Sequence, residues 1–239
     1  MIPYIIINGV SSKSVNGLLI QNLPPISKPK IRTELEEIDG RDGDVVTILG
    51  YAAYDKSFNI GLRGDYNIDD VIKFFDASGQ IIFSNEVDKY YNFATYEQID
   101  FERLIRYRTA TVKMHVQPFK YSAEEKEATY SYPSGTTSAT IKARNNGNIY
   151  SKPKITITGA GTIYVYLNGT QVFTISLASA GETIIIDVNN MNAYDQDGNY
   201  LNRQVIGGYD NFILAAGSNA ITINGAITNV SLDNVSRWI

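Results

Sequence analysis

The side chains that could do chemistry are few, and they are far apart in the sequence. His115 is the only histidine, and a His-based triad requires a nucleophile and an orienting acid around it. Its neighbours Val112, Met114 and Val116 alternate with polar residues. This alternation predicts a strand with His115 on its polar face. We therefore interpret the histidine as a solvent-facing residue and not as a general base or metal ligand.

A second candidate is the acidic segment Asp195–Asn199, whose sequence DQDGN looks like part of a calcium loop. An EF-hand loop places glycine at position six and a bidentate glutamate at position twelve. Here Gly198 is fourth and Ile206 is twelfth, so the spacing fails. We interpret the segment as a hairpin turn between Ala193 and Leu201, with a weakly held surface cation as the alternative. No metal site and no cofactor is predicted.

The densest acidic cluster lies between residues 34 and 44 and comprises Glu34, Glu36, Glu37, Asp39, Asp42 and Asp44. Paired carboxylates can catalyse glycoside hydrolysis, but so crowded a run is typical of a solvated or interface-facing edge. Ile31, Thr33 and Leu35 alternate with charged residues, and a Gly/Asp-rich turn precedes the strand-like run VVTILGY. The pattern predicts a long hairpin over residues 31–51.

The elements that must position these residues are mainly β-strands. The N-terminal part contains strand patterns, including 90–99 and 101–107, and one helix over 65–77 capped by Asn67. The C-terminal part contains about nine short strands separated by Gly and Asn turns, which is typical of a β-sandwich. The fold class is therefore mainly β, with a β-rich N-terminal domain and a C-terminal sandwich.

Charge divides the 239 residues into two domains. The first 133 residues carry 15 of the 21 basic and 19 of the 25 acidic residues. We place the N-terminal domain at 1–130 and the C-terminal domain at 131–239, joined by a segment that Pro133 and Gly135 interrupt. The net charge of −4 argues against a nucleic-acid binder. The absence of cysteine excludes disulfides and thiolate metal sites.

The beginning of the chain and its hydropathy bear on location. The segment MIPYIIINGV has no basic region before its apolar residues, so we do not interpret it as a signal peptide. No window approaches the roughly 20 apolar residues of a membrane span. We expect a chain that is made in a cytoplasm and does not insert into a membrane.

Short motifs in a fixed order run along nearly the whole chain. The first two are Asp39–Asp44, followed by a strand and Tyr51, and Gln117–Tyr121. The others lie in the C-terminal part: Asn146–Asn148 with Ser151–Pro153 and Ile155–Gly159, then Val165–Gly169, Ile184–Asp187 and Ala216–Ile221. In this order they resemble the distal tail proteins of siphophages. The chain departs from that pattern at Asn211–Gly217, where the family has an FPxL-PG segment.

The resemblance implies a structural, non-enzymatic hub of a phage tail tip. It implies an N-terminal domain that closes into a homo-hexameric ring and a galectin-like C-terminal β-sandwich. The implied partners are the tail tube protein, the tail-associated lysin or fibre and a receptor-binding protein, with DNA passing through the channel without specific binding. The implied location is the virion tail tip, assembled in the bacterial host cytoplasm. On the hairpin, we predict inter-subunit contacts by Glu34, Glu36, Asp39, Arg41, Asp42, Asp44 and Tyr51.

Two other functions compete with this interpretation. A carbohydrate-binding adhesin or lectin-like module would need exposed aromatic and hydrogen-bonding side chains gathered on one face. A glycosidase would need an acid pair of which one member lies in an apolar setting, and the sequence has no recognisable pair of that kind. We therefore expect no enzymatic activity, and keep the carbohydrate-binding module as the alternative.

Overall fold

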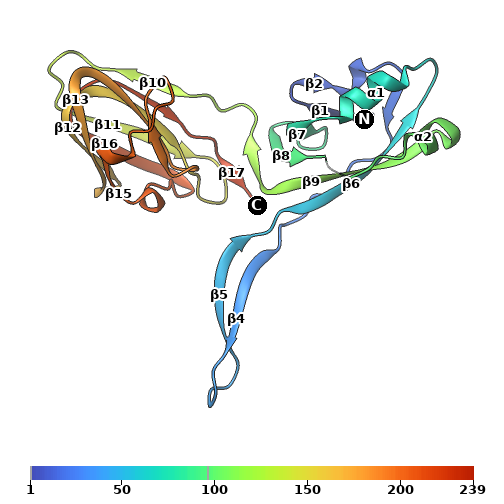
Figure 1. Ribbon diagram of the computed structural model, residues 1–239, viewed down its shortest axis with the longest axis horizontal. Coiled ribbons are helices and arrows are strands. Elements are labelled where there is room, and N and C mark those ends of the chain that lie inside the picture. Colours follow the sequence, from blue (N-terminus) through green and yellow to red (C-terminus); the bar gives the residue numbers. More distant parts are fainter. Residues whose placement is uncertain (1, 96) are drawn as a thin grey trace. The chain divides into compact units, whose positions relative to one another are not determined.

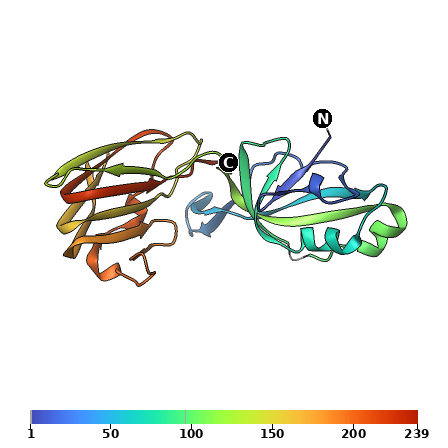
Figure 2. The same ribbon diagram turned by 90° about the horizontal axis from the view of Figure 1, so that it is seen from above.

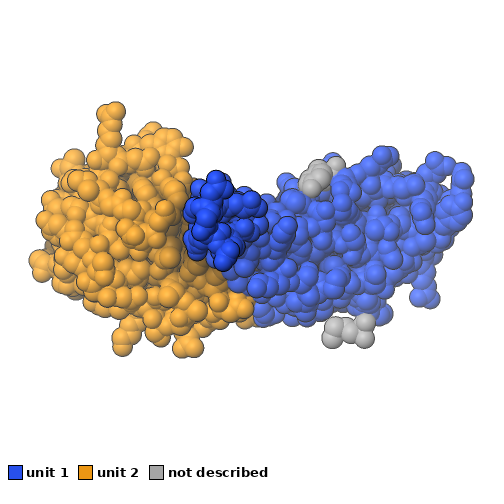
Figure 3. Space-filling model, turned by 90° about the horizontal axis from the view of Figure 1, so that it is seen from below, with its two compact units in different colours: residues 1–123, 239 blue, residues 124–238 orange. Residues whose placement is uncertain are grey.

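A computed structural model describes residues 2–95 and 97–239 of the chain. The chain forms two compact units, which are coloured separately in Figure 3. The first unit comprises Met1–Ala123 and Ile239, and the second comprises Glu124–Trp238. Strands dominate both units (Figure 1), so the predicted mainly-β class is confirmed. None of the helices in the described ranges has the length and apolarity needed to cross a membrane.

The first unit is built on an antiparallel sheet with the strand order β2-β1-β7-β8-β9-β6-β3. Its strands are β1 (Ile5–Ile7), β2 (Val10–Ser11), β3 (Leu18–Ile20), β6 (Tyr54–Leu62), β7 (Ser78–Phe83), β8 (Lys89–Ala94) and β9 (Thr109–Ser122). In β9, Val112, Met114 and Val116 are fully buried while His115 lies on the other face, as the alternation predicts. A short 3-10 helix, η1 (Ser12–Ser14), follows β2.

Two helices accompany this sheet, where one was predicted. Helix α1 (Ile68–Phe75) begins as expected, because the Asn67 side chain accepts a hydrogen bond from the Asp69 amide at 3.0 Å. Its Val71, Phe74 and Phe75 are buried.

The predicted strand over 101–107 is wrong, because this segment forms helix α2 (Phe101–Tyr107). The Asp100 side chain accepts a hydrogen bond from the Arg103 amide at 2.8 Å and so caps the helix. Leu104 is fully buried, and Arg108 ends the helix in the left-handed conformation with φ 58°. The spacing of Phe101 and Leu104 is that of a helix face, and the polar cap decides between helix and strand.

The second unit contains one antiparallel sheet with the strand order β10-β16-β12-β13-β14. In addition, β11 pairs with β16, and β15 pairs with β13. The strands of this sheet are β10 (Ala128–Ser131), β11 (Ser138–Asn145), β12 (Lys154–Leu167), β13 (Thr170–Asp187), β14 (Asn192–Tyr194), β15 (Val205–Gly207) and β16 (Gly217–Asp233). The short strand β17 (Arg237–Trp238) follows β16 and is not one of the strands of this sheet. Two 3-10 helices, η2 (Asn202–Gln204) and η3 (Tyr209–Asn211), lie between β14 and β16.

The long strands bend, so that this sheet folds over into the predicted two-layer sandwich (Figure 2). One half of β16 pairs with β11 and the other half pairs with β10. Register shifts near Gly159 and Gly161 produce the bend in β12. The sequence pattern predicts separate strands at 152–158 and 162–168, because it interprets Gly-Ala-Gly as a turn; in the structure these glycines form a bulge within one strand. Apolar side chains fill the space between the layers, among them Ile157, Phe173 and Ile223.

Candidate assembly site

The most exposed element of the first unit is a hairpin made of β4 (Ile31–Glu37) and β5 (Asp44–Tyr51). The predicted hairpin over 31–51 is therefore confirmed. These two strands form a separate two-stranded sheet that extends away from the main sheet of its unit (Figure 1). Among the described residues no further strand pairs with β4 or β5, so both edges of the hairpin have unpaired backbone groups. We call residues 31–51 the arm.

One face of the arm is apolar. Residues directly opposite each other in an antiparallel pair lie on the same face, and the arm pairs Thr33 with Ile48 and Leu35 with Val46. The exposed fractions of Leu35, Val46 and Ile48 are 60%, 57% and 70%. We call this the apolar face; it consists of Ile31, Thr33, Leu35, Val46, Ile48 and Tyr51. Exposed apolar residues gathered in this way are typical of an interaction surface.

The opposite face is acidic. Glu34 lies opposite Thr47, and Glu36 lies opposite Val45. Both glutamates are exposed, and the alternation of side chains keeps them away from Leu35. The acidic face, defined by Arg32, Glu34, Glu36, Val45 and Thr47, makes the arm an amphipathic ribbon.

A β-bulge separates the root of the arm, which comprises Ile31, Arg32, Gly50 and Tyr51, from its outer part. The register shifts between Arg32 and Thr33, and Leu49 is the extra residue on β5. Gly50 has φ +117°, a conformation that other residues adopt only with strain. The Arg32 Nη2 donates to the Leu49 carbonyl at 3.3 Å. Since bulges redirect side chains and increase twist, this one leaves Leu49 52% exposed.

The predicted contact residues are distributed over the whole arm. Glu34 and Glu36 share the acidic face, Asp44 pairs with Glu37 near the tip, and the tip itself contains Asp39, Arg41 and Asp42, all exposed. Tyr51 is at the root, where its ring lies edge-on to Phe119 with 5.3 Å between centroids. Contact with a neighbouring copy stays a prediction for all seven. Leu35, Val46 and Ile48 were not predicted as contacts, although their spacing along two paired strands already indicates an apolar face.

The root of the arm is fastened to the main sheet. The Ala52 amide donates to the Lys30 carbonyl at 2.8 Å, and this bond closes the hairpin at its base. Residues 21–30, which lead into β4, are held by side chains of β6. The Tyr54 hydroxyl donates to the Ser27 carbonyl at 3.3 Å, and the Lys56 Nζ donates to the Pro25 carbonyl at 2.8 Å.

Lys56 belongs to a buried polar network beneath the root. The residue is 3% exposed, and its Nζ lies 4.9 Å from the ring centroid of Tyr91. The Lys120 Nζ and the Glu86 Oε1 are 2.8 Å apart, and the Tyr91 hydroxyl donates to the Glu86 Oε2 at 3.4 Å. Burial lowers the pKa of Lys56 to about 8, although the nearby Glu86 carboxylate opposes this shift.

This shift predicts that the protein becomes more stable as the pH rises above about 8. The unfolded chain keeps the Lys56 proton up to its ordinary pKa of 10.5, whereas the folded chain releases it near pH 8. Between these values the unfolded state binds more protons, so the free energy of unfolding increases with pH. Urea denaturation should show a gain of about 2 kcal/mol between about pH 7.5 and about pH 9.5.

Lys56→Met provides the control for this pH dependence. The variant has no ammonium group at this position, so its stability should change little over the same range. Burial also raises the pKa of Tyr54 and Tyr91. Their opposing effect sets in as the pH approaches their ordinary pKa of 10.0 and is present equally in Lys56→Met and in the unmodified chain. An equal gain in Lys56→Met and in the unmodified chain would contradict the assignment.

His115 is part of an ion-pair cluster on the same sheet. Its Nδ1 lies 2.7 Å from the Asp55 Oδ1, and the Lys113 Nζ contacts both Asp55 at 3.0 Å and Glu97 at 2.6 Å. The hydrogen bond from His115 is the largest cause that lowers the pKa of the Asp55 carboxyl. Among residues 2–95 and 97–239, no group of three or more His, Cys, Asp or Glu is arranged to hold a metal ion.

Comparison with solved structures identifies phage tail proteins with this fold. The Dit protein (gp 19.1) of phage SPP1, described as a paradigm of the hub adsorption apparatus in phages that infect Gram-positive bacteria, aligns with a TM-score of 0.70 at 15% identity. The alignment covers 100% of both chains. A chain of the phage P2 baseplate, in its activated conformation with Ca, aligns with a TM-score of 0.50 at 9% identity and covers 99% of this chain and 98% of that one.

These similarities are confined to structure. No protein-family model matches the chain, and no curated protein matches it in sequence. The SPP1 Dit alignment nevertheless includes both units from end to end, so a shared sandwich alone does not account for it. The chain therefore has the fold of the phage distal tail (Dit) hub proteins, as its sequence motifs predict.

Proposed function

We propose that this chain is a distal tail protein, a structural and non-enzymatic hub of a siphophage tail tip. Its copies form a homo-hexameric ring at the virion tail tip after synthesis in the bacterial host cytoplasm. The ring joins the tail tube protein to the tail-associated lysin or fibre and to a receptor-binding protein. The main support is the alignment with SPP1 Dit over the full length of both chains.

The arm supports ring formation on physical grounds. An isolated two-stranded hairpin is only marginally stable in water, and the exposed apolar face adds a cost that burial against a partner would remove. A ring requires one patch of each copy to meet a different patch of the next copy. We infer that the apolar face packs on the neighbouring copy, while the unpaired strand edges allow pairing by strand addition.

The charge of the chain fits a channel through which DNA passes. The net charge is −4, and Glu34 and Glu36 lie together on the acidic face. If the apolar face packs on a neighbour, Glu34 and Glu36 do not make the predicted inter-subunit contacts, and the acidic face is left toward solvent or the channel. Carboxylates there would repel the DNA backbone and prevent adhesion.

The mass of the purified chain in solution tests the proposal. We expect a species of about 160 kDa by light scattering, six times the 26.5 kDa of the chain, and rings with a central hole in negative-stain images. Such rings should not retard duplex DNA in a gel. A chain that stays monomeric at high concentration, alone and with its tail-tube partner, would contradict the ring.

A further inference from the structure

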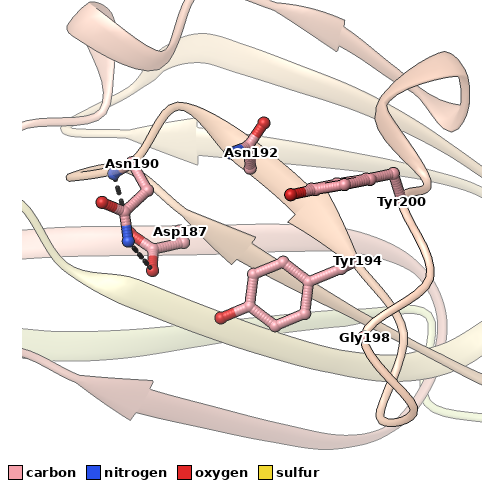
Figure 4. A pocket seen from close by; sticks show the side chains of 6 residues that line it. All are labelled: Asp187, Asn190, Asn192, Tyr194, Gly198 and Tyr200. Atoms are coloured by element: carbon pink, nitrogen blue, oxygen red, sulfur yellow. Dashed lines mark hydrogen bonds between the residues drawn. The ribbon is translucent and has the colours of Figure 1, made fainter.

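The second unit has a polar pocket that lies outside the arm. It lies where the end of β13, strand β14 and the loop 195–200 meet (Figure 4). The cavity has a volume of about 470 Å³ and is lined by Asp187, Asn190, Asn192, Tyr194, Gly198 and Tyr200. This volume falls within the range of about 300–1,000 Å³ that is usual for small-molecule sites.

One part of the lining is a carboxylate that fixes an amide. Asp187 is only 6% exposed. Its Oδ1 accepts a hydrogen bond from the Asn190 backbone amide at 3.0 Å, and its Oδ2 accepts one from the Asn190 side-chain Nδ2 at 2.9 Å (Figure 4). The Lys154 Nζ lies 3.9 Å from the Asp187 Oδ2. Asn190 is thereby oriented before any ligand arrives, which reduces the entropy cost of binding.

A second amide is oriented in the same way. The Asn192 Oδ1 accepts a hydrogen bond from the Asn202 Nδ2 at 3.2 Å. Asn202 is itself fixed, because its Oδ1 accepts a hydrogen bond from the Ala193 amide at 2.6 Å. With the carbonyl oxygen of Asn192 engaged, its Nδ2 group remains as a donor for a ligand.

Two tyrosines border the pocket and are held by a closed loop (Figure 4). Tyr194 and Tyr200 form an antiparallel bridge, and the predicted hairpin turn between Ala193 and Leu201 is confirmed by a 2.7 Å backbone hydrogen bond. The Asp195 carboxylate accepts hydrogen bonds from the Asp197 amide at 2.9 Å and from both the amide and Nδ2 of Asn199 at 2.8 Å.

These bonds account for the DQDGN sequence without a cation. The hydrogen bond from the Asn199 side chain is the largest cause that lowers the pKa of Asp195, so the carboxylate is satisfied by the loop itself. The loop thus presents Tyr200, which is 73% exposed, on a preorganised support. A tyrosine ring offers a rigid apolar surface and a polar hydroxyl tip.

The composition of the lining selects the class of ligand. A phosphate or another anion would need cationic donors, yet the charged group in the lining is the carboxylate of Asp187. An apolar ligand would remove water from the remaining acceptor positions of Asp187 and from the Asn192 Nδ2 group and give them no hydrogen-bond partner in return. A neutral polyol meets both demands, because hydroxyls donate to carboxylate oxygens and accept from amides, while the faces of sugar rings pack on tyrosine.

We propose that this pocket binds a neutral sugar unit of a polysaccharide. Tyr200 stacks on one face of the sugar, and Asp187 accepts hydrogen bonds from the sugar hydroxyls. The side-chain amides of Asn190 and Asn192 form further hydrogen bonds with these hydroxyls. This activity is additional to the hub function, and the lining residues all belong to the second unit, whereas the arm belongs to the first.

The test uses the full chain on an array of neutral and phosphate-bearing glycans, followed by saturation-transfer NMR with the best neutral saccharide. We expect binding to neutral glycans that weakens by about tenfold or more in Tyr200→Ala, because one stacking surface is lost. Asp187→Asn, which preserves the shape of the side chain, should weaken binding as well. Tyr164→Ala serves as the matched control, since Tyr164 is 40% exposed on another strand of the same unit.

Each outcome decides the proposal. Loss of binding in Tyr200→Ala with full binding in Tyr164→Ala supports it, provided that both variants melt at the temperature of the unmodified chain. Equal binding by all variants, binding only to phosphate-bearing glycans, or no binding to any neutral glycan on the array overturns it. Light scattering on the same samples reports ring formation separately, so that failure of the saccharide site and failure of the hub proposal are distinguishable.

Discussion

Replacing Ile48 by lysine should release the ring into monomers. Ile48 is 70% exposed on the apolar face, so the isolated chain should tolerate the substitution with little loss of stability. In the proposed ring this side chain is buried against a neighbouring copy. The variant would lose about 2 kcal/mol of apolar burial and would also have to bury an ammonium group. We expect the dissociation constant of each contact to increase by about a hundredfold or more, measured by light scattering over a concentration series.

Thr47→Lys is the matched control for this prediction. Thr47 precedes Ile48 in β5, is exposed, and lies on the acidic face opposite Glu34. It therefore receives the same charge in the same strand, but on the other side of the ribbon and next to a carboxylate that favours it. The ring should persist in Thr47→Lys. If both variants dissociate to the same extent, added charge and not the apolar face is responsible.

The comparison of these two positions shows what sequence patterns can and cannot predict. Period-two alternation predicted the hairpin and the buried side of β9, because strand geometry alone places alternate residues on opposite faces. It could not show that, in the described part of the chain, no other strand covers Leu35 and Val46. That absence depends on the tertiary arrangement of the unit, and it is what makes an ordinary apolar strand face a candidate interface.

Other differences have local physical causes. The segment 101–107 has apolar residues that suit either a strand or a helix, and the Asp100 cap, with its 2.8 Å hydrogen bond, selects the helix. The sequence pattern interprets Gly159-Ala160-Gly161 as a turn between two strands, whereas a bulge lets β12 continue through these residues. Tyr194 and Tyr200 are six residues apart in sequence, and their meeting at one pocket requires the loop closed by Asp195.

The buried network beneath the arm leads to the second large effect. Glu86→Gln should destabilise the first unit by about 3–5 kcal/mol, because it removes the charge partner of Lys120 and leaves a buried ammonium uncompensated. The side chains of Lys120 and Glu86 are 9% and 14% exposed, with 2.8 Å between their charged atoms. Urea denaturation near pH 7 measures the loss. Asp88→Asn is the matched control. The Asp88 side chain is 56% exposed and its partner Lys89 is 17% exposed, so this pair has a solvated carboxylate and should be worth only about 1 kcal/mol.

The pH dependence of this loss separates an electrostatic effect from a packing effect. The Glu86 carboxylate raises the pKa of Lys56, against the larger effect of burial. Without it, Lys56 should release its proton at a lower pH, so that a rise in pH relieves more of the buried positive charge in the variant than in the unmodified chain. The deficit of Glu86→Gln should therefore be smaller at about pH 9.5 than at about pH 7. A deficit that is the same at both pH values would mean that the glutamine merely packs poorly, and that the network does not hold the root of the arm through charge.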